Sequence, residues 1–193
     1  MAPKGKLFVV SAPSGAGKTS VVSEALKRLQ KDFDISRTIT HTSRLPREGE
    51  VDGKDYVFHA KEDFEQKLKD GFFLEFTEYA DKLYGSPASI LSDLERGKSF
   101  ISVLDIVGAK SISKAYPDAC CIWIETKDID TLRNRLLKRG TETECQIDER
   151  LKVAEQEMKE AHNLQRLFTY RLINEDFEQA VRELIMIIKR ELS

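Results

Sequence analysis

The feature that most constrains this chain is a Gly-rich turn between an apolar, β-branched run and a helix-like segment. The turn ends in Gly17-Lys18-Thr19, follows the apolar residues 7–10, and precedes apolar residues at helical spacing up to Leu29. Backbone N–H groups in such a turn point inward, and the next helix adds its positive N-terminal end. Lys18 can then reach the β- and γ-phosphates of ATP, and Thr19 can offer its hydroxyl to Mg²⁺. The candidate ATP-binding residues are Ser14, Gly15, Ala16, Gly17, Lys18, Thr19 and Ser20.

The match to the general phosphate-loop pattern, G-x-x-x-x-G-K-[ST], departs at its first position, where the chain has Ala12. The last three positions, Gly17, Lys18 and Thr19, agree with the pattern. An ordinary strand-to-helix turn with a surface lysine is the alternative, but it leaves the flanking strand and helix patterns as coincidence. We therefore favour the phosphate loop.

Composition sets the broad class of the protein. The chain has 193 residues, of which 40% are hydrophobic and 33% charged, as expected for one globular domain. A net charge of −2 argues against broad binding of nucleic acids or membrane surfaces, because either needs an excess of Lys and Arg. No apolar run approaches the ~18 residues of a membrane span. We expect a cytoplasmic protein without nucleic-acid or membrane partners, and the sequence carries no mark of its oligomeric state. The spacing of the cysteines and histidines predicts neither disulfides nor a zinc site.

Strand-like runs alternate with helical patterns along most of the chain. The runs occupy residues 7–10, 100–106, 120–125 and 170–174, and amphipathic helices are expected at 128–139 and 176–192. Alternation of this kind predicts an α/β fold with a parallel sheet flanked by helices.

Glycine, proline and serine residues indicate where helices begin and end. Ser86-Pro87 predicts a helix cap followed by a proline in the first turn, ahead of Ile90. Gly97 and Gly140 are expected to end the segments that they follow.

Two stretches interrupt the alternation. Residues 36–85 combine arginines, turn residues and many aromatics, which suggests a small α+β insertion, and residues 139–158 continue as a long, highly charged helix. In ATP-using folds, such insertions recognise the acceptor and close over the phosphates. We therefore expect one domain, residues 1–193, with a core formed by 1–35, 86–138 and 159–193, an acceptor insertion at 36–85 and a mobile lid at 139–158.

Two arginines lie three residues apart in the acceptor insertion. Arg44 and Arg47, with a proline between them, would present two forked donors from one loop, an arrangement suited to an oxyanion. The alternative is a solvated basic turn whose arginines pair with Glu48 and Glu50.

In its succession of motifs, the chain resembles the guanylate kinases over nearly its whole length. Ala12 is also met in members of that family. The resemblance implies a P-loop kinase fold and transfer of the γ-phosphoryl group of ATP to GMP, and to dGMP, with Mg²⁺. The motifs are Ser11-Ala12-Pro13-Ser14-Gly15-Ala16-Gly17-Lys18, Thr42-Ser43-Arg44-x-Pro46-Arg47-x-Gly49-Glu50, Gly53-Lys54-Asp55-Tyr56, Phe73-Leu74-Glu75, Tyr84-Gly85-Ser86 and Arg139-Gly140-Thr141-Glu142-Thr143-Glu144.

By the same resemblance, specific residues are expected to bind GMP. Two cations and two phenolic hydroxyls would hold its phosphate, and hydroxyls and carboxylates would contact its base. The phosphate group is assigned to Arg44, Arg47, Tyr56 and Tyr84, and the base to Thr40, Glu75, Ser86 and Asp105.

Two carboxylates are chemically suited to recognising guanine, independently of the resemblance. Guanine presents N1–H and N2–H₂ donors that Glu75 and Asp105 can accept, whereas adenine has an acceptor at N1 and no amino group at C2. A site built on such hydrogen bonds can discriminate by on the order of 10⁴. Taken alone, Glu75 reads as a surface residue, so its role depends on the resemblance.

One position departs from the family. Where guanylate kinases usually show Leu-Asp-Ile-Asp, an ungapped alignment gives Ser102-Val103-Leu104-Asp105, so that Val103 replaces the first aspartate. In other phosphate-loop enzymes an aspartate at the end of a neighbouring strand supports Mg²⁺. Thr19 then remains the candidate metal ligand. A shifted alignment would instead give Asp105 the role beside the metal.

The residues expected to act in catalysis surround the moving phosphoryl group. The resemblance implies Lys18, Arg47, and the lid arginines Arg139 and Arg150, and it places Asn174 and Glu175 beside the adenine. Arg135 is a weaker candidate. For Arg133 we favour a solvated helix face.

Two other functions are considered. A related kinase for another nucleoside monophosphate would leave Glu75 and Asp105 irrelevant to the base. A non-catalytic guanylate kinase-like module that binds proteins would not need the intact phosphate loop or the lid arginines.

Overall fold

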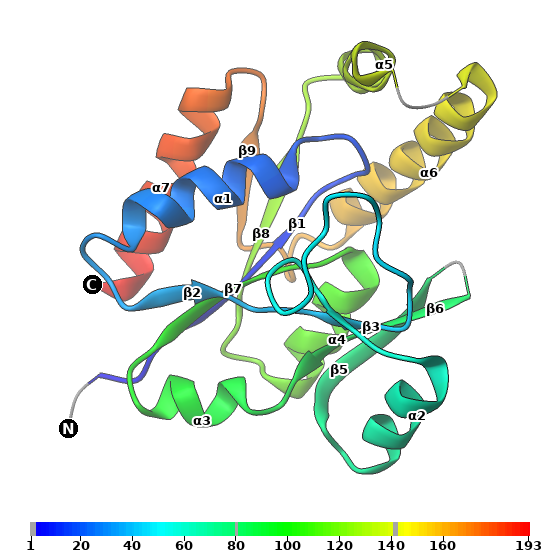
Figure 1. Ribbon diagram of the computed structural model, residues 1–193. Helices are drawn as coiled ribbons and strands as arrows, with labels where there is room; N and C mark the ends of the chain where they lie inside the picture. Colours follow the sequence, from blue (N-terminus) through cyan, green and yellow to red (C-terminus); the bar gives the residue numbers. More distant parts are fainter. Residues whose placement is uncertain (1–2, 80, 141–142) are drawn as a thin grey trace.

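The computed structural model describes residues 3–79, 81–140 and 143–193, while the side chains of Tyr79 and Arg139 lie outside the described part. A five-stranded sheet with the order β2-β7-β1-β8-β9 forms its centre, and every neighbouring pair of strands is parallel (Figure 1). The α/β fold with a parallel sheet is thereby confirmed. The strands are β1 (Leu7–Ser11), β2 (Ile35–Arg37), β7 (Ser99–Val103), β8 (Cys120–Glu125) and β9 (Tyr170–Ile173).

The strand predicted at residues 100–106 is wrong in its last part. β7 ends at Val103, and helix α4 (Ile106–Ala115) begins three residues later. Asp105 decides this boundary, because its carboxylate accepts a hydrogen bond from the backbone N–H of Gly108 at 2.7 Å and so caps the helix. The last strand also ends one residue early, since Asn174 follows β9.

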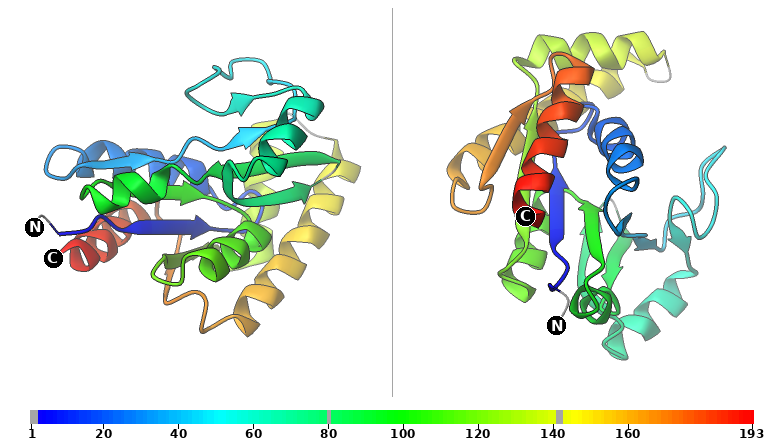
Figure 2. Two further views of the ribbon diagram at one scale, coloured as in Figure 1. Left: turned by 90° about the horizontal axis from the view of Figure 1, so that it is seen from below. Right: turned by 90° about the vertical axis from the view of Figure 1, so that its left-hand side faces the viewer.

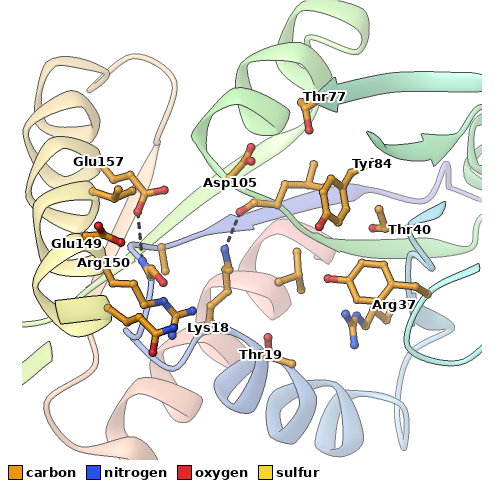
Figure 3. A pocket seen from close by; sticks show the side chains of 17 residues that line it. Lys18, Thr19, Arg37, Thr40, Thr77, Tyr84, Asp105, Glu149, Arg150 and Glu157 are labelled. Atoms are coloured by element: carbon orange, nitrogen blue, oxygen red, sulfur yellow. Dashed lines mark hydrogen bonds between the residues drawn. The ribbon is translucent and has the colours of Figure 1, made fainter. Parts of the chain in front are cut away.

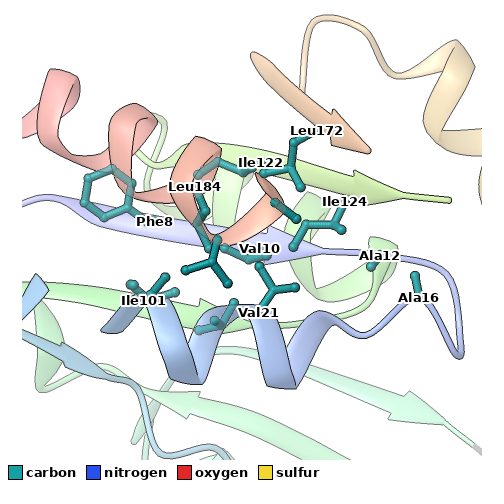
Figure 4. Close-up of a cluster of buried hydrophobic side chains, with 14 of the residues drawn as sticks. Phe8, Val10, Ala12, Ala16, Val21, Ile101, Ile122, Ile124, Leu172 and Leu184 are labelled. Atoms are coloured by element: carbon teal, nitrogen blue, oxygen red, sulfur yellow. The ribbon is translucent and has the colours of Figure 1, made fainter. Parts of the chain in front are cut away.

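The two faces of β1 belong to two separate cores. Phe8 and Val10 pack into a cluster shared with α1 (Lys18–Leu29) and α7 (Phe177–Leu192), as Figure 4 shows. Leu7 and Val9 face the other cluster, which includes the buried Trp123. This alternation along a strand that is buried on both faces is typical of a parallel sheet between two layers of helices.

The helices cover both faces of the sheet. α1 and α7 contact each other on one face, and α4 and α3 (Ile90–Glu95) cover the other (Figures 1 and 2). The start of β1 and the end of α7 lie near each other, where Lys6 pairs with Glu191, and β1 points away from this end of the molecule (Figure 2, left). The carboxyl ends of the strands, where ligands bind in open parallel sheets, therefore face the opposite side of the molecule.

A second, smaller sheet carries the acceptor insertion. Its strand order is β4-β3-β6-β5, with antiparallel pairing of β6 to both β3 and β5. The α+β character expected for this stretch is present. Its elements are β3 (His41–Thr42), β4 (Val57–Phe58), α2 (Lys61–Lys69), β5 (Phe73–Tyr79) and β6 (Lys82–Pro87).

The ends of the insertion differ from expectation. β2 crosses the expected boundary at residue 36, because it pairs with β7 as an edge of the central sheet. The helix cap predicted at Ser86-Pro87 is wrong: both residues end β6, and α3 begins at Ile90 after Ser89, which makes no side-chain capping bond. Ser86 is held in the strand because its N–H and hydroxyl both bind Glu75.

The lid stretch contains a long helix. α5 (Ile129–Arg139) is followed by its C-cap Gly140, whose φ of 65° is in the left-handed region that glycine tolerates. α6 (Glu144–Asn163) begins with a capping box between Thr143 and Gln146 and extends past residue 158. The expected motif residues Thr141 and Glu142 lie outside the described part of the chain. None of the described helices is long and apolar enough to cross a membrane.

Candidate active site

The Gly-rich turn joins the carboxyl end of β1 to the first turn of α1. Gly15 and Gly17 have φ angles of 89° and 86°, which few other residues adopt. Gly17 is the N-cap of α1 and provides no side-chain cap. The first N–H groups of α1 are therefore available to an anion, which the helix dipole also favours.

Two side chains from the second half of the chain hold this turn. Asn174 Nδ2 donates to the carbonyl oxygen of Ala16 at 2.7 Å, and Arg135 donates to the same oxygen at 3.2 Å. Arg135 also donates to the carbonyl oxygen of Asn174. A Cβ at Gly17 would lie 2.7 Å from Asn174 Nδ2, so that the bracing requires glycine there. Arg135 thus supports the turn, a role that the sequence pattern did not indicate.

A cleft of about 620 Å³ opens where the turn, the acceptor insertion and α6 meet (Figure 3). Lys18 Nζ lies in this cleft and donates to the carbonyl oxygen of Leu104 at 3.0 Å. Partial burial lowers the pKa of Lys18, and the charges of Glu157 and Asp105 oppose this shift. A bound triphosphate would add negative charge and favour the protonated amine. Thr19 also lines the cleft.

α6 contributes one face to the cleft. Arg150, a predicted lid residue, lines it together with Gln146, Val153 and Glu157, a set whose spacing puts them along one side of the helix. Glu157 accepts a hydrogen bond from the backbone N–H of Ser14 at 3.2 Å, and burial raises its pKa. Glu157 is not among the residues predicted for the site, although its position two turns after Arg150 could have indicated it.

Two other arginines of the lid region, Arg133 and Arg139, belong to α5. Arg139 closes α5, but its side chain lies outside the described part of the chain. Arg133 forms an ion pair with Asp148 on α6, and both side chains are exposed. The solvated face expected for Arg133 is therefore confirmed, with an acidic partner.

A second pocket, of about 340 Å³, lies on the phosphate loop beside Asn174. Gly15, Gly17 and Ser20 line it together with Arg135 and Asn174. Asn174 is 3% exposed, and its Oδ1 has no hydrogen-bond partner among the described residues. This buried acceptor is suited to an N–H donor of a bound molecule.

Glu175 differs from its neighbour. Its side chain is exposed and lies 3.7 Å from Lys127, and it lines neither the cleft nor the second pocket.

Glu75 is the buried carboxylate of the acceptor insertion. Ser86 donates its backbone N–H at 3.1 Å and its hydroxyl at 2.8 Å to Glu75 Oε1. The other oxygen, Oε2, is buried and has no partner among the described residues. Burial, with a smaller contribution from the charge of Asp105, raises the pKa of Glu75 to about 7. Asp105 itself lines the cleft.

The raised pKa of Glu75 predicts a pH-dependent stability. The folded protein binds the Glu75 proton more tightly than the unfolded chain, so that this group's contribution is full at low pH and is lost as pH rises from about 4.5 to about 7. The difference corresponds to about 3 kcal/mol. Glu75→Gln removes it, so we expect the Tm of the variant relative to the native protein to rise by about 5 °C or more between pH 5 and pH 8. Thermal melts of both proteins across this range test it.

Glu78→Gln provides the control for that measurement, because Glu78 is an exposed residue of the same strand. Its melting temperature should follow that of the native protein at every pH. An equal pH dependence in the native protein and Glu75→Gln would show that Glu75 is ionised in the fold without cost.

Aromatic and basic residues form the outer part of the acceptor site. Tyr56, Tyr84 and Thr40 line the cleft, and the two tyrosine rings lie edge to face at 6.2 Å. Arg44 lies over the ring of Tyr56, at 5.2 Å, but does not line the cleft. Its guanidinium is instead paired with Glu50 at 2.9 Å.

Glu50 also holds the second arginine of this loop through the backbone. The N–H of Arg47 donates to Glu50 Oε2 at 2.8 Å, and the Arg47 side chain is exposed. Pairing with Glu50 raises the pKa of Arg44 and lowers that of Glu50. The alternative of a basic turn paired with acidic residues therefore describes Arg44 as it stands in this structure. A phosphate group could therefore bind the Arg44 guanidinium only by displacing the Glu50 carboxylate.

Among the described residues, no group of three or more His, Cys, Asp or Glu side chains is arranged to hold a metal ion. Thr19 can supply one hydroxyl ligand in the cleft. This donor set suits a cation carried largely by the oxygens of a bound nucleotide.

Comparison with known proteins gives one consistent result. The family model described as guanylate kinase matches residues 4–191. The guanylate kinase of Rubrobacter xylanophilus is 37% identical over 188 residues, covering 97% of this chain and 95% of the relative. That of Clostridioides difficile is 38% identical over 97% of this chain and 89% of its own. The crystal structure of guanylate kinase from Anaplasma phagocytophilum superposes with a TM-score of 0.79 at 26% identity, covering 99% of this chain and 88% of that one.

Proposed function

The chain belongs to the guanylate kinase family, and from this we propose which of its residues bind ATP, which bind GMP and which assist transfer of the γ-phosphoryl group from ATP to GMP. The reaction gives ADP and GDP. ATP is assigned to the phosphate loop and the second pocket, and GMP to the acceptor insertion. dGMP is a further acceptor, because none of the assigned contacts requires the ribose 2′-hydroxyl.

The observation that carries the GMP assignment is Glu75 Oε2, which is buried and has no hydrogen-bond partner in the part of the chain that the structure describes. A hydrogen-bond acceptor buried without a partner is costly, and a ligand N–H that reaches it recovers that cost. Guanine offers donors at N1 and N2, and Asp105 is near enough for its charge to affect Glu75. AMP would leave this acceptor unpaired. Thr40 and Ser86 add hydroxyl groups to the same end of the site.

The GMP phosphate is assigned to the outer part of the acceptor site. Tyr56 and Tyr84 present phenolic hydroxyls in the cleft, and Arg44 lies against Tyr56. We propose that the phosphate dianion displaces Glu50 as the ion-pair partner of Arg44. The side chain of Arg47 then moves from its exposed position to bind the same phosphate. Bidentate hydrogen bonds from two guanidinium groups to a dianion support this exchange.

ATP is assigned to the turn between β1 and α1. Its phosphates would accept hydrogen bonds from the N–H groups of residues 14–20, and Lys18 would exchange the Leu104 carbonyl for phosphate oxygens. The second pocket beside Asn174 would take the adenine, with Glu175 at its solvent side. Thr19 would hold Mg²⁺, which when bound neutralises charge on the phosphates.

The lid is assigned to closure over the reacting phosphates. Arg150 reaches the cleft from α6, and Arg139 would join it from the end of α5. Closure would exclude water, which otherwise could accept the phosphoryl group in place of GMP. The acceptor insertion (36–85) and lid (139–158) are thus proposed to move relative to the core.

The activity is tested by measuring ADP release from Mg·ATP with GMP, and in parallel with AMP, UMP, dTMP and no acceptor. We expect turnover with GMP, and rates near the acceptor-free background with the other three. Faster turnover with another monophosphate would contradict the assignment of Glu75 and Asp105. ATP binding without turnover would instead support a module that binds proteins.

A further inference from the structure

Arg37 is a positively charged residue of the cleft that the assignments above do not use. It is the last residue of β2, it is half-buried, and it lines the cleft with Lys18 and Thr19. Its side chain makes no hydrogen bond or ion pair with any described residue. The planar guanidinium group of an arginine presents several N–H donors in a fixed fork, so the cleft holds a positively charged donor group here.

The neighbouring strand explains why Arg37 has no acidic partner from the sheet. β2 pairs with β7 in parallel, with Arg37 opposite Ile101. Val103, two residues further along β7, is on the same face as Ile101 and also lines the cleft. It offers no carboxylate. The described acidic residues of α6 that line the cleft, Glu149 and Glu157, lie on its other side (Figure 3).

Arg37 lies between the proposed ATP region and the proposed GMP region. Figure 3 shows its guanidinium with Thr19 of α1 on one side and Thr40 and Tyr84 of the acceptor insertion on the other. Thr19 belongs to the proposed ATP end, and Tyr84 to the proposed GMP phosphate. A donor group between them faces the path along which a phosphoryl group would move.

We propose that Arg37 is a further catalytic residue, which contacts the phosphoryl group in transit between ATP and GMP. This inference rests on the proposed function. During transfer, the bond from the γ-phosphorus to the bridging oxygen of ADP breaks, and a bond to a phosphate oxygen of GMP forms. Arg37 donates hydrogen bonds to the equatorial oxygens of the phosphoryl group and neither gains nor loses a proton. Its contacts are strongest where charge is spread over those oxygens, in the transition state.

The proposal is tested with Arg37→Ala, and Arg96→Ala is the control. Arg96 is an exposed arginine at the end of α3, and it does not line the cleft. Two quantities are measured for each protein: steady-state rates with ATP and GMP, and dissociation constants for GMP and for a bisubstrate analogue that joins adenosine and guanosine through five phosphates. We expect Arg37→Ala to lower kcat by about 10- to 100-fold. Its affinity for GMP should change less than about threefold, and its affinity for the bisubstrate should fall about tenfold or more. Arg96→Ala should behave as the native protein.

Other outcomes overturn the proposal in distinguishable ways. Equal weakening of GMP and bisubstrate binding would make Arg37 a ligand of the GMP phosphate only. Unchanged kinetics would make it a solvated end of an edge strand. If the native protein fails to turn over GMP, the proposed function fails and the role of Arg37 with it. Should Arg37→Ala melt early, Arg37→Gln, which keeps the aliphatic stem, carries the same comparison.

Discussion

Lys18→Ala is expected to lower kcat for phosphorylation of GMP by at least ~1000-fold. Lys18 is the one residue of the phosphate loop whose charge can follow the β- and γ-phosphate oxygens. The structure holds its amine in the cleft on the carbonyl oxygen of Leu104, a neutral partner that phosphate oxygens can replace. Alanine leaves the turn itself intact, because the turn is braced by Asn174 and Arg135. The loss should therefore fall mainly on kcat and little on stability.

Lys27→Ala is the matched control for this measurement. Lys27 is an exposed lysine of the same helix, so that its removal changes net charge equally without touching the cleft. Steady-state rates and thermal melts of both variants separate catalysis from folding. Lys18→Arg, which keeps the charge but changes its shape and reach, should recover only part of the activity. A Lys18→Ala enzyme with kcat within tenfold of the native value would contradict the assignment of ATP to the phosphate loop.

The sequence was sufficient to predict a parallel central sheet and four of its five strands, but not their order. β1, β7 and β8 are largely apolar runs because both faces of the sheet are buried there, and such runs are visible without knowledge of their partners. β2 was missed because it has only three residues and lies beside the arginine-rich stretch. The over-long strand at 100–106 has a different cause: Leu104 and Ile106 continue the apolar pattern, but Asp105 between them caps a helix.

The candidate site was predictable in its residue types and not in its contacts. The turn at residues 14–20 and the arginines of the acceptor insertion were identified from local patterns. The brace from Asn174 to Ala16 spans 158 positions, and the bond from Ser14 to Glu157 spans 143. No local pattern encodes such contacts, because the fold alone brings these segments together. The contact of Glu157 with Ser14 and the place of Arg37 in the cleft are therefore visible only in the three-dimensional structure.

Val103 shows a case in which the sequence leaves two assignments open and the structure favours one of them. Aligning it with a family aspartate left open whether Asp105 serves the base or the metal. In the structure Asp105 caps α4 and its charge acts on Glu75, which supports the assignment to the base. Val103 and Arg37 of the adjacent strand β2 both line the cleft, so the ends of these two strands present one apolar and one basic side chain to it.

Glu75→Gln is expected to change acceptor selectivity more than any other single substitution in the acceptor insertion. Glu75 accepts hydrogen bonds from Ser86 through Oε1, and in the proposed assignment its Oε2 accepts from the guanine N–H groups. The glutamine oxygen can keep the bonds to Ser86, which turns the amide –NH₂ toward the base. That donor opposes guanine N1–H but complements the N1 acceptor of adenine. We expect kcat/KM for GMP to fall by about 10³ and that for AMP to rise above background.

Glu78→Gln, on the exposed side of the same strand, should leave both values unchanged. Rates with GMP and AMP, measured at pH 8 where the native Glu75 is mostly ionised, give the ratio directly. A uniform fall with both acceptors would indicate that the variant has lost the geometry of the site and not its selectivity. An unchanged preference for GMP would show that Asp105 and the hydroxyls of Thr40 and Ser86 read the base without Glu75. Because the substitution preserves shape and exchanges one acceptor for a donor, a change in the ratio can be attributed to that hydrogen bond alone.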